Sequence, residues 1–206
     1  MIAIIDYGVG NLRSVEKAFH FINADAEISS DRNFILNADA VVLPGVGAFA
    51  DAMESLNRAG MVDVVKKVAA SGKPFLGICL GMQLLFDYSE EGGGNVEGLG
   101  IFKGSVRQLP HDMNLKVPHM GWNLLKIRKE CGLFNNISKS PFVYFVHSFY
   151  VDAQDRDIVT ATTGYGIEFD VAVAKDNVFA TQFHPEKSGE IGLGILKNWV
   201  SAFKKN

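Results

Sequence analysis

A cysteine stands between two glycines in the run Gly77-Ile78-Cys79-Leu80-Gly81. This run lies where an apolar strand is expected to pass directly into a helix. A nucleophile on such a sharp turn is exposed at the carboxyl edge of a sheet, and the glycines let strand and helix approach closely. The helix dipole favours a thiolate, and the N–H of Leu80 would point where an oxyanion could form. The pattern predicts that Cys79 is a nucleophile. The alternative is a buried cysteine that behaves as a small hydrophobic residue.

A thiol nucleophile needs a base, and the base needs a group that orients it. Among the five histidines, His184 is the best placed, because it follows an expected strand at 178–183 and precedes Pro185-Glu186. Residues two apart in an extended segment face the same way, so His184 and Glu186 could reach one site. Alone, this tripeptide is more simply a solvated strand end. Together with the cysteine turn it predicts the triad Cys79, His184 and Glu186.

A second glycine-flanked run, Pro44-Gly45-Val46-Gly47, follows another expected strand at the same sheet edge. Two glycines around one residue let a peptide plane turn freely and bring an N–H close to a ligand. If the triad is present, Val46 and Leu80 are the candidates that supply N–H groups to an oxyanion. Without the triad, a plain strand-to-helix turn is the simpler interpretation.

Other conspicuous residues are expected to be structural or exposed. The run 8–10 suggests a dinucleotide-binding loop, but Arg13 stands where the third glycine is needed, so a turn leading to a helix N-cap at Asn11 is preferred. Structural or surface roles are likewise expected for His147, Cys131 and the pairs Glu90-Glu91 and Lys66-Lys67.

The elements that must position these residues alternate in type through the first hundred residues. Short apolar runs at 2–6, 40–43 and 75–78 predict buried strands. Apolar residues at helical spacing predict helices after Asn11, over 61–68 with a stop at Gly72, and over 80–86. Alternating apolar strands and helices predict a mostly parallel sheet covered by helices on both faces.

The second half of the chain has shorter strand-like segments, at 105–109, 123–128, 142–147, 158–163, 171–175 and 178–183, and a final helix is expected over 189–203. The fold class predicted is therefore α/β with an antiparallel annex in the second half. The glycine-rich loop at 90–95 is too short to be a domain linker, so residues 1–206 are expected to form a single domain.

Composition argues against several classes of protein. The chain has 20 Lys and Arg against 23 Asp and Glu, with the signs interspersed, so no basic stripe favours nucleic acid. No stretch approaches the ~18 apolar residues of a membrane span, and the first six residues lack signal-peptide features. Two cysteines, Cys79 and Cys131, make neither a disulfide framework nor a metal-ligand pair. We expect a cytoplasmic chain with no metal and no cofactor.

These motifs resemble the class I (triad) glutamine amidotransferases along the whole chain. The resemblance is carried by Gly-Ile-Cys-Leu-Gly-Met-Gln at 77–83, Pro-His-Met-Gly-Trp-Asn at 118–123, Tyr-Phe-Val-His-Ser at 144–148, and Gln-Phe-His-Pro-Glu-Lys-Ser at 182–188. Three of these segments, in this order, are similar to one branch, the glutaminase subunits of imidazole glycerol phosphate synthase in histidine biosynthesis.

The resemblance implies glutamine hydrolysis through a cysteine thioester. Cys79 would attack the side-chain amide, His184 would activate the thiol and protonate the leaving ammonia, and Glu186 would hold the imidazole. Gly45, Gly47, Gln83 and Ser148 match positions at the glutamine site. In this family the strand at 44–47 can also keep a carbonyl pointing inward until a ligand of the partner turns it.

A partner is expected on chemical grounds as well, because ammonia free in water near pH 7 is mostly ammonium, which is not a nucleophile. A chain of this length has no room for an acceptor site, so ammonia must pass directly to another protein. In the resembled branch that protein is a (β/α)₈-barrel cyclase, which forms a heterodimer with the glutaminase and makes imidazole glycerol phosphate and aminoimidazole-carboxamide ribotide. Interface positions of the branch match Asn11, Trp122, Tyr144 and Lys187.

Three alternatives remain open at this point. The chain could feed ammonia to a related synthase, such as one that aminates a nucleotide sugar. It could be a scaffolding subunit with an inactive pocket, although Cys79, His184 and Glu186 argue against that role. It could also be a stand-alone cysteine hydrolase. One departure from relatives is Phe149, where they often carry tyrosine, so a role for that hydroxyl is in doubt here.

Overall fold

The computed structural model describes residues 1–110 and 115–203. The helices are α1 (Leu12–Phe21), α2 (Arg32–Asn37), α3 (Phe49–Arg58), α4 (Val62–Ala70), α5 (Leu80–Gln83) and α6 (Gly189–Phe203), with 3₁₀ turns η1 (Gly132–Phe134), η2 (Arg156–Ile158) and η3 (Pro185–Lys187). The strands are β1 (Ile2–Ile5), β2 (Ala26–Ser29), β3 (Ala40–Gly45), β4 (Phe75–Cys79), β5 (Tyr88–Ser89), β6 (Val96–Glu97), β7 (Gly104–Gln108), β8 (His119–Leu124), β9 (Lys126–Ile127), β10 (Phe142–His147), β11 (Phe149–Ala153), β12 (Val159–Tyr165), β13 (Ile167–Lys175) and β14 (Val178–Thr181).

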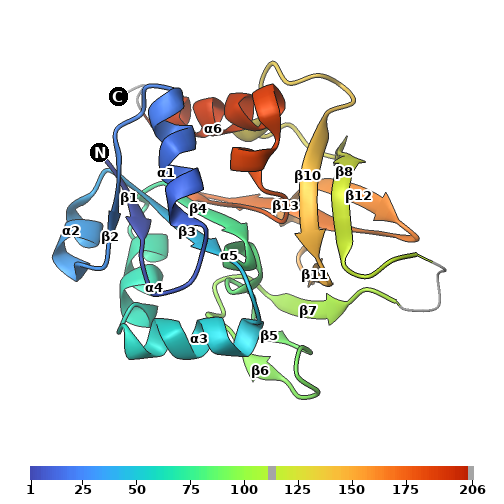
Figure 1. Cartoon of the computed structure of the whole chain (residues 1–206), viewed down its shortest axis with the longest axis horizontal. Coiled ribbons are helices and arrows are strands. Elements are labelled where there is room, and N and C mark those ends of the chain that lie inside the picture. Colours follow the sequence, from blue (N-terminus) through green and yellow to red (C-terminus); the bar gives the residue numbers. More distant parts are fainter. Residues whose placement is uncertain (111–114, 204–206) are drawn as a thin grey trace.

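The first half of the chain builds a parallel sheet, as predicted. Strands β2, β1, β3, β4 and β14 lie side by side in that order, and each runs parallel to its neighbour (Figure 1). Strand β14 comes from the far end of the chain and pairs with β4, so that Thr181 lies opposite Ile78. This pairing brings the residues that follow β14 to the same sheet edge as Cys79.

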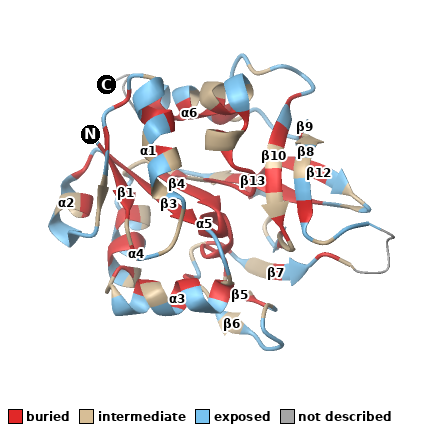
Figure 2. Cartoon of the chain, viewed as in Figure 1, coloured by how far each residue is buried: buried red, intermediate tan, exposed pale blue. Residues whose placement is uncertain are grey.

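Helices cover both faces of this parallel sheet. Successive residues of a strand point to opposite faces. Ile2 and Ile4 pack in one cluster with residues of α1 and α6, whereas Ala3 and Ile5 pack in the other with residues of α2, α3 and α4. Figure 2 shows the central strands as a buried layer between these helices. Each fully buried aliphatic side chain stabilises the fold by about 1.5–3 kcal/mol, so the sheet rests on two apolar layers.

The second half adds the antiparallel strands that were predicted. Strand β13 pairs antiparallel with β14, β12 and β11, and β11 pairs antiparallel with β7. Strands β8 and β10 form a separate two-stranded antiparallel sheet. No helix in the described residues is long and apolar enough to cross a membrane.

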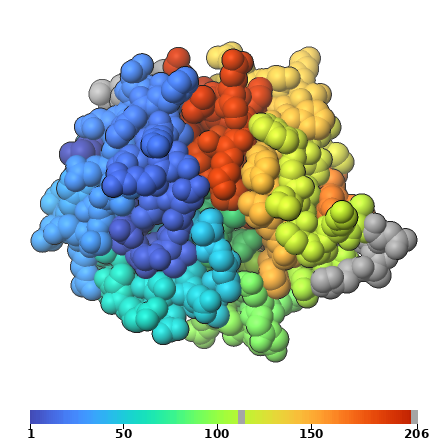
Figure 3. Space-filling model, in the orientation of Figure 1, coloured from blue at the N-terminus to red at the C-terminus, as the bar shows by residue number. Residues whose placement is uncertain are grey.

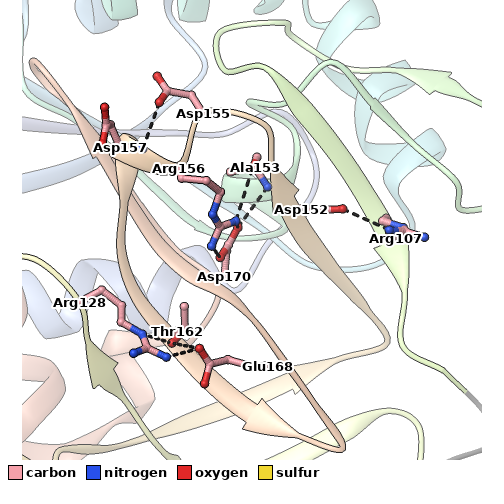
Figure 4. A network of polar contacts seen from close by, with 10 residues as sticks. All are labelled: Arg107, Arg128, Asp152, Ala153, Asp155, Arg156, Asp157, Thr162, Glu168 and Asp170. Carbon is pink, nitrogen blue, oxygen red and sulfur yellow. Dashed lines mark hydrogen bonds and ion pairs between the residues drawn. The ribbon is translucent and has the colours of Figure 1, made fainter.

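A polar network ties the antiparallel strands together (Figure 4). Arg156 donates two hydrogen bonds to the buried carboxylate of Asp170, at 2.6 and 2.7 Å, and the backbone N–H of Ala153 donates to the same carboxylate at 3.1 Å. These bonds join the η2 turn and the end of β11 to β13. Two residues earlier in β13, Glu168 bonds to Arg128, which also bonds to Thr162 of β12. The network joins strands of the antiparallel part of the sheet. It is separate from the parallel strand β4, which ends at Cys79, so we assign it a structural role.

Two expected elements differ from the structure. The helix expected at 80–86 ends at Gln83, because the carbonyls of Leu84, Leu85 and Phe86 accept hydrogen bonds from the backbone at 99–102 instead of from a continuing helix. The strand expected at 123–128 changes partner at Leu125: β8 pairs with β10, and β9 pairs with β12. The strands β2, β5, β6 and β11 and the helices α2 and α3 were not predicted.

The turn from β4 into α5 depends on close backbone contact. A Cβ atom on Gly81 would lie only 1.9 Å from the carbonyl oxygen of Leu43 in β3. A Cβ atom on Gly77 would lie 2.9 Å from the carbonyl oxygen of Gly81. The glycines flanking Cys79 are therefore required by packing, because α5 crosses directly over the ends of β3 and β4.

Replacing Gly81 should lower the stability of the protein. We expect Gly81→Ala to lower the free energy of unfolding by about 3 kcal/mol or more, since the new methyl group must displace the backbone of β3. Urea unfolding of Gly164→Ala is the control, because a Cβ atom on Gly164 meets no heavy atom within 4 Å. Equal midpoints for the two variants would contradict this account of the turn.

Candidate active site

Cys79 is the last residue of β4 and lies immediately before α5. Its backbone has φ +56° and ψ −112°, a left-handed conformation that a non-glycine residue adopts only when the surrounding structure holds it. Close packing of α5 on β3 supplies that constraint. The side chain is buried, and the amide nitrogen of Gln182 lies 3.8 Å from Sγ. The turn thus aims the thiol at the carboxyl edge of the sheet.

His184 and Glu186 form a buried pair beside this turn. The imidazole Nδ1 lies 2.7 Å from a carboxylate oxygen of Glu186, and the two side chains are 2% and 1% exposed. The prediction that this contact arises in an extended segment was wrong. Residues 185–187 form the 3₁₀ turn η3, and His184 is its N-cap. Among the described residues, Nε2 of His184 has no hydrogen-bond partner, so the imidazole is held at one nitrogen and free at the other.

Neighbouring groups make the His184 imidazole more basic than usual. Burial alone would lower its pKa, but interactions with Cys79 and Glu186 raise the pKa to about 9. An imidazole of that basicity takes and holds a proton at neutral pH. Since Cys79 and His184 line the same pocket, the proton can come from the thiol.

The glycine-flanked segment lies across the pocket from His184. Strand β3 ends at Gly45, which pairs with Cys79 at the end of β4. Val46 and Gly47 follow and line the pocket, and Gly47 has φ +93°. Leu80, the residue after the cysteine, lines it as well. The backbone on which an oxyanion was expected to bind is therefore next to the thiol.

The pocket has a volume of about 260 Å³ and brings most of the predicted site residues together. Its lining consists of Val46, Gly47, Cys79, Leu80, Gln83, Glu91, Pro118, Val146, His147, Ser148, Phe149 and His184. Gly45 is not in the lining, because it is buried beneath it. Glu186 is not in this lining, and its carboxylate contacts His184, which is.

Gln83 is held by other polar groups, one of which the sequence did not single out. Its amide nitrogen donates to the carbonyl of Phe149 at 3.0 Å and to the side-chain oxygen of Gln182 at 2.9 Å. Both amide hydrogens are therefore used, and only the oxygen of Gln83 remains to accept from a ligand. Gln182 lies within the strand expected at 178–183, where nothing in the sequence distinguishes it from other polar residues, so only the fold shows its neighbours.

Glu91 was predicted to be solvated surface, and this prediction was wrong. Its carboxylate accepts a hydrogen bond from the backbone N–H of Phe49 at 2.7 Å, at the start of α3. This bond holds Glu91 at the pocket, where it is the one acidic side chain in the lining among the described residues. The sequence showed only an acidic pair in a glycine-rich loop, which gave no sign of the contact with a residue 42 positions away.

A pair of histidines lies on β8 and β10, with His147 in the pocket lining and His119 behind it. His147 Nδ1 bonds to the carbonyl of Phe149 at 2.8 Å, and its Nε2 lies 2.9 Å from Nδ1 of His119. Since the carbonyl can only accept, His147 carries its proton on Nδ1, and His119 donates to it. Burial lowers the pKa of His147 to about 3 and that of His119 to about 4. Both rings are neutral near pH 7, so neither competes with His184 for charge.

Three of the predicted partner-contact residues lie together on an exposed face. The register of β8 and β10 places Trp122 opposite Tyr144, with ring centroids 6.3 Å apart, and Lys187 Nζ lies 6.0 Å from the tyrosine ring. Trp122 is 57% exposed, as are more than half of Met120 and Phe142 on the same two strands. We call Met120, Trp122, Phe142 and Tyr144 the apolar face.

The fourth residue, Asn11, lies at the start of α1 and is exposed. It occupies the N-cap position as predicted, but its side chain makes no capping hydrogen bond. Helix α1 packs against η3, which carries Lys187. Figure 3 shows α6, in red, between α1 in blue and strands β8 and β10 in yellow and amber, all on one side of the molecule.

Cys131, the second cysteine, is half-buried at the start of η1, away from the pocket lining. Burial raises the pKa of its thiol, which makes it a poor nucleophile. Within the described residues no three His, Cys, Asp or Glu side chains form a group that could hold a metal ion.

Comparison with known proteins agrees with this geometry. The family model described as "Glutamine amidotransferase class-I" matches residues 3–202. The "Imidazole glycerol phosphate synthase subunit HisH" of Caldanaerobacter subterraneus subsp. tengcongensis is 55% identical over 204 residues, which cover 99% of each chain. The protein of the same name from Bacillus cereus strain G9842 is 53% identical and covers all of this chain and 98% of its own.

The fold is also found among solved structures. One described as "Crystal structure of glutamine amidotransferase" matches with a TM-score of 0.77 and 17% identity, covering 99% of this chain and all of the other. At that identity the likeness shows the fold alone, which is the α/β class I glutamine amidotransferase fold that the sequence predicted. The family model and the two relatives go further: the chain belongs to the class I glutamine amidotransferases and, within them, to the family of the HisH subunits of imidazole glycerol phosphate synthase.

Proposed function

We propose that residues 1–206 form one glutamine amidotransferase domain that hydrolyses glutamine at Cys79 and passes the ammonia to a cyclase subunit of imidazole glycerol phosphate synthase. The observation that carries this proposal is the pocket itself. A thiol on a strained turn shares it with a buried imidazole that is held by a carboxylate at 2.7 Å. A cytoplasmic location remains a prediction.

The reaction would begin with proton transfer from Cys79 to Nε2 of His184. The sulfur attacks the side-chain carbonyl carbon of glutamine, and the oxyanion is stabilised by backbone N–H groups of Leu80 and of the segment at Val46. His184 then gives its proton to the leaving nitrogen, which departs as ammonia and leaves a glutamyl thioester. Water, deprotonated by the same imidazole, releases glutamate, while Glu186 keeps the imidazole oriented.

The pocket lining offers complementary groups to the rest of the substrate. The side-chain oxygen of Gln83 can accept a hydrogen bond, and Gly47 and Ser148 also lie in the lining. Gly45 would support this segment from below. Glu91 is suited to the α-ammonium group of glutamine, because opposite charges attract strongly in a partly dry pocket and no other carboxylate of residues 1–110 and 115–203 lines it.

The apolar face supports a partner at this edge of the molecule. Exposed aromatic residues that pack on one another are typical anchors of a protein interface, and ammonia is useful only if it is kept from water. The related HisH chains are named as subunits. We infer a heterodimer in which the cyclase contacts Trp122 and Tyr144, with Asn11 and Lys187 at the edges of the contact.

The first prediction concerns the nucleophile. Cys79→Ala should abolish glutamate release from glutamine, because no other group in the pocket can form the thioester, while the fold and the complex with the cyclase persist. Cys131→Ala is the control and should keep full activity. Glutamate is measured by a coupled assay, with the cyclase present and absent. Full activity in Cys79→Ala would disprove the proposed mechanism.

The second prediction concerns substrate binding. Glu91→Gln keeps the shape of the side chain and an oxygen for the Phe49 N–H, but it removes the negative charge. We expect KM for glutamine to rise about tenfold, equivalent to about 1.4 kcal/mol, with kcat changed little. The adjacent exposed residue supplies the control, since Glu90→Gln should leave both constants unchanged. A normal KM in Glu91→Gln would show that the α-ammonium group of glutamine does not bind this carboxylate.

The third prediction concerns the partner. Trp122→Ala should weaken binding to the cyclase by about 2 kcal/mol, roughly thirtyfold, because it removes a central aromatic anchor. Isothermal titration calorimetry measures the dissociation constant. Phe21→Ala is the control, because Phe21 is 75% exposed but lies at the opposite end of α1 from Asn11. Equal affinity for both variants would place the partner elsewhere.

A further inference from the structure

Tyr7 is a buried tyrosine that the proposed mechanism does not use. It lies two residues beyond the end of β1, and it is 4% exposed. Its hydroxyl donates a hydrogen bond of 3.0 Å to the carbonyl of Pro44, 37 residues away. Pro44 is the next-to-last residue of β3, so the bond is made one residue before the strand ends at Gly45.

The hydroxyl also packs directly beneath the segment that follows. A Cβ atom on Gly45 would lie 2.9 Å from the Tyr7 hydroxyl and 3.0 Å from Cβ of Leu80. Tyr7 and the start of α5 thus both pack against Gly45 where a side chain would lie, so this position is closed to any residue larger than glycine. Burial, and then the nearby Cys79, raise the pKa of Tyr7 far above its ordinary value. The hydroxyl therefore keeps its proton and always donates to Pro44.

The segment depends on such an anchor because the two glycines that flank Val46 restrict its peptide planes little, whereas Pro44 fixes its own φ and pairs with Ile78 of β4. Proline has no N–H to give to a sheet, and glycine adopts left- and right-handed conformations with similar ease. Val46 stands between two glycines, and it is 37% exposed. The direction of its N–H is therefore set by how firmly the chain is held at Pro44 and Gly45.

We propose that Tyr7 is a positioning residue, which aims the backbone N–H groups at Val46 and Gly47 into the pocket by holding the carbonyl of Pro44. This inference rests on the proposed function. Tyr7 does not touch the substrate; it acts through the backbone of β3. Its contribution is made in the transition state, when negative charge develops on the carbonyl oxygen of glutamine, and not in substrate binding.

Tyr7→Phe tests this inference in the full chain bound to the cyclase, because it removes only the hydroxyl. We expect kcat for glutamate release to fall about tenfold, which corresponds to about 1.4 kcal/mol, while KM for glutamine stays within about twofold. Alkylation of Cys79 by iodoacetamide should keep its rate, because displacement at a saturated carbon forms no oxyanion.

Tyr165→Phe is the matched control. Tyr165 also donates its hydroxyl to a backbone carbonyl, that of Lys116 at 2.8 Å, but it lies at the end of β12 and outside the pocket lining. This variant should leave kcat, KM and alkylation unchanged. Thermal unfolding of both variants measures the cost of losing one such bond and shows that each is folded.

Two results would overturn the inference while glutamine hydrolysis stands. An unchanged kcat in Tyr7→Phe would mean that the hydroxyl does not orient the segment. A parallel fall in kcat and in alkylation would place its effect on the thiol or on the whole pocket. If the unmodified complex releases no glutamate, the proposed function fails first, and Tyr7 has no reaction to assist.

Discussion

The site depends on one close contact between backbones, the crossing of α5 over the end of β3. Because Gly81 has no side chain, the first turn of α5 reaches the carbonyl of Leu43, and Cys79 is forced into a left-handed conformation. The thiol then lies at the sheet edge, with the amide nitrogen of Gln182 3.8 Å from Sγ. The other parts of the site lie around that fixed sulfur. His184 follows β14, and the glycine-flanked segment at Val46 follows β3, the two strands that pair with β4. The backbone strain at Cys79 persists because the two apolar layers stabilise the sheet by more free energy than the strain costs.

The distribution of protons around the pocket follows from hydrogen bonding and burial. Three histidines lie close together, yet one is made basic and two are kept neutral. His184 faces a carboxylate and a thiol, whereas His147 faces a carbonyl and another imidazole. Donors and acceptors in the second set leave no place for an extra proton. Charge is thereby confined to the part of the pocket where a proton must move.

The sequence allowed the parallel half of the fold and the catalytic cluster to be predicted, because both have strong local signals. Apolar strands, glycines beside Cys79 and the His-Pro-Glu run can be found without knowledge of the fold. Gln182 and Glu91 could not be found in this way, because their partners are distant in sequence and polar residues look alike until their neighbours are known. The helix predicted from Leu80 was too long for a related reason: its carbonyls are taken by backbone at 99–102, a long-range contact that overrides helical propensity.

The two faces of strand β10 have different surroundings. Val143, Phe145 and His147 point inward to the core and the pocket, while Phe142 and Tyr144 point outward to the apolar face. Since the side chains of a strand alternate, losing or gaining one residue in β10 would exchange the two faces at once. Evolution can therefore alter Phe142 and Tyr144 by substitution and leave the pocket intact. It cannot freely alter Val146, which lies on the same side of the strand but lines the pocket, and it cannot change the length of the strand. A lineage that acquires a new binding partner must keep the length of β10 and can substitute only outward-facing residues such as Phe142 and Tyr144.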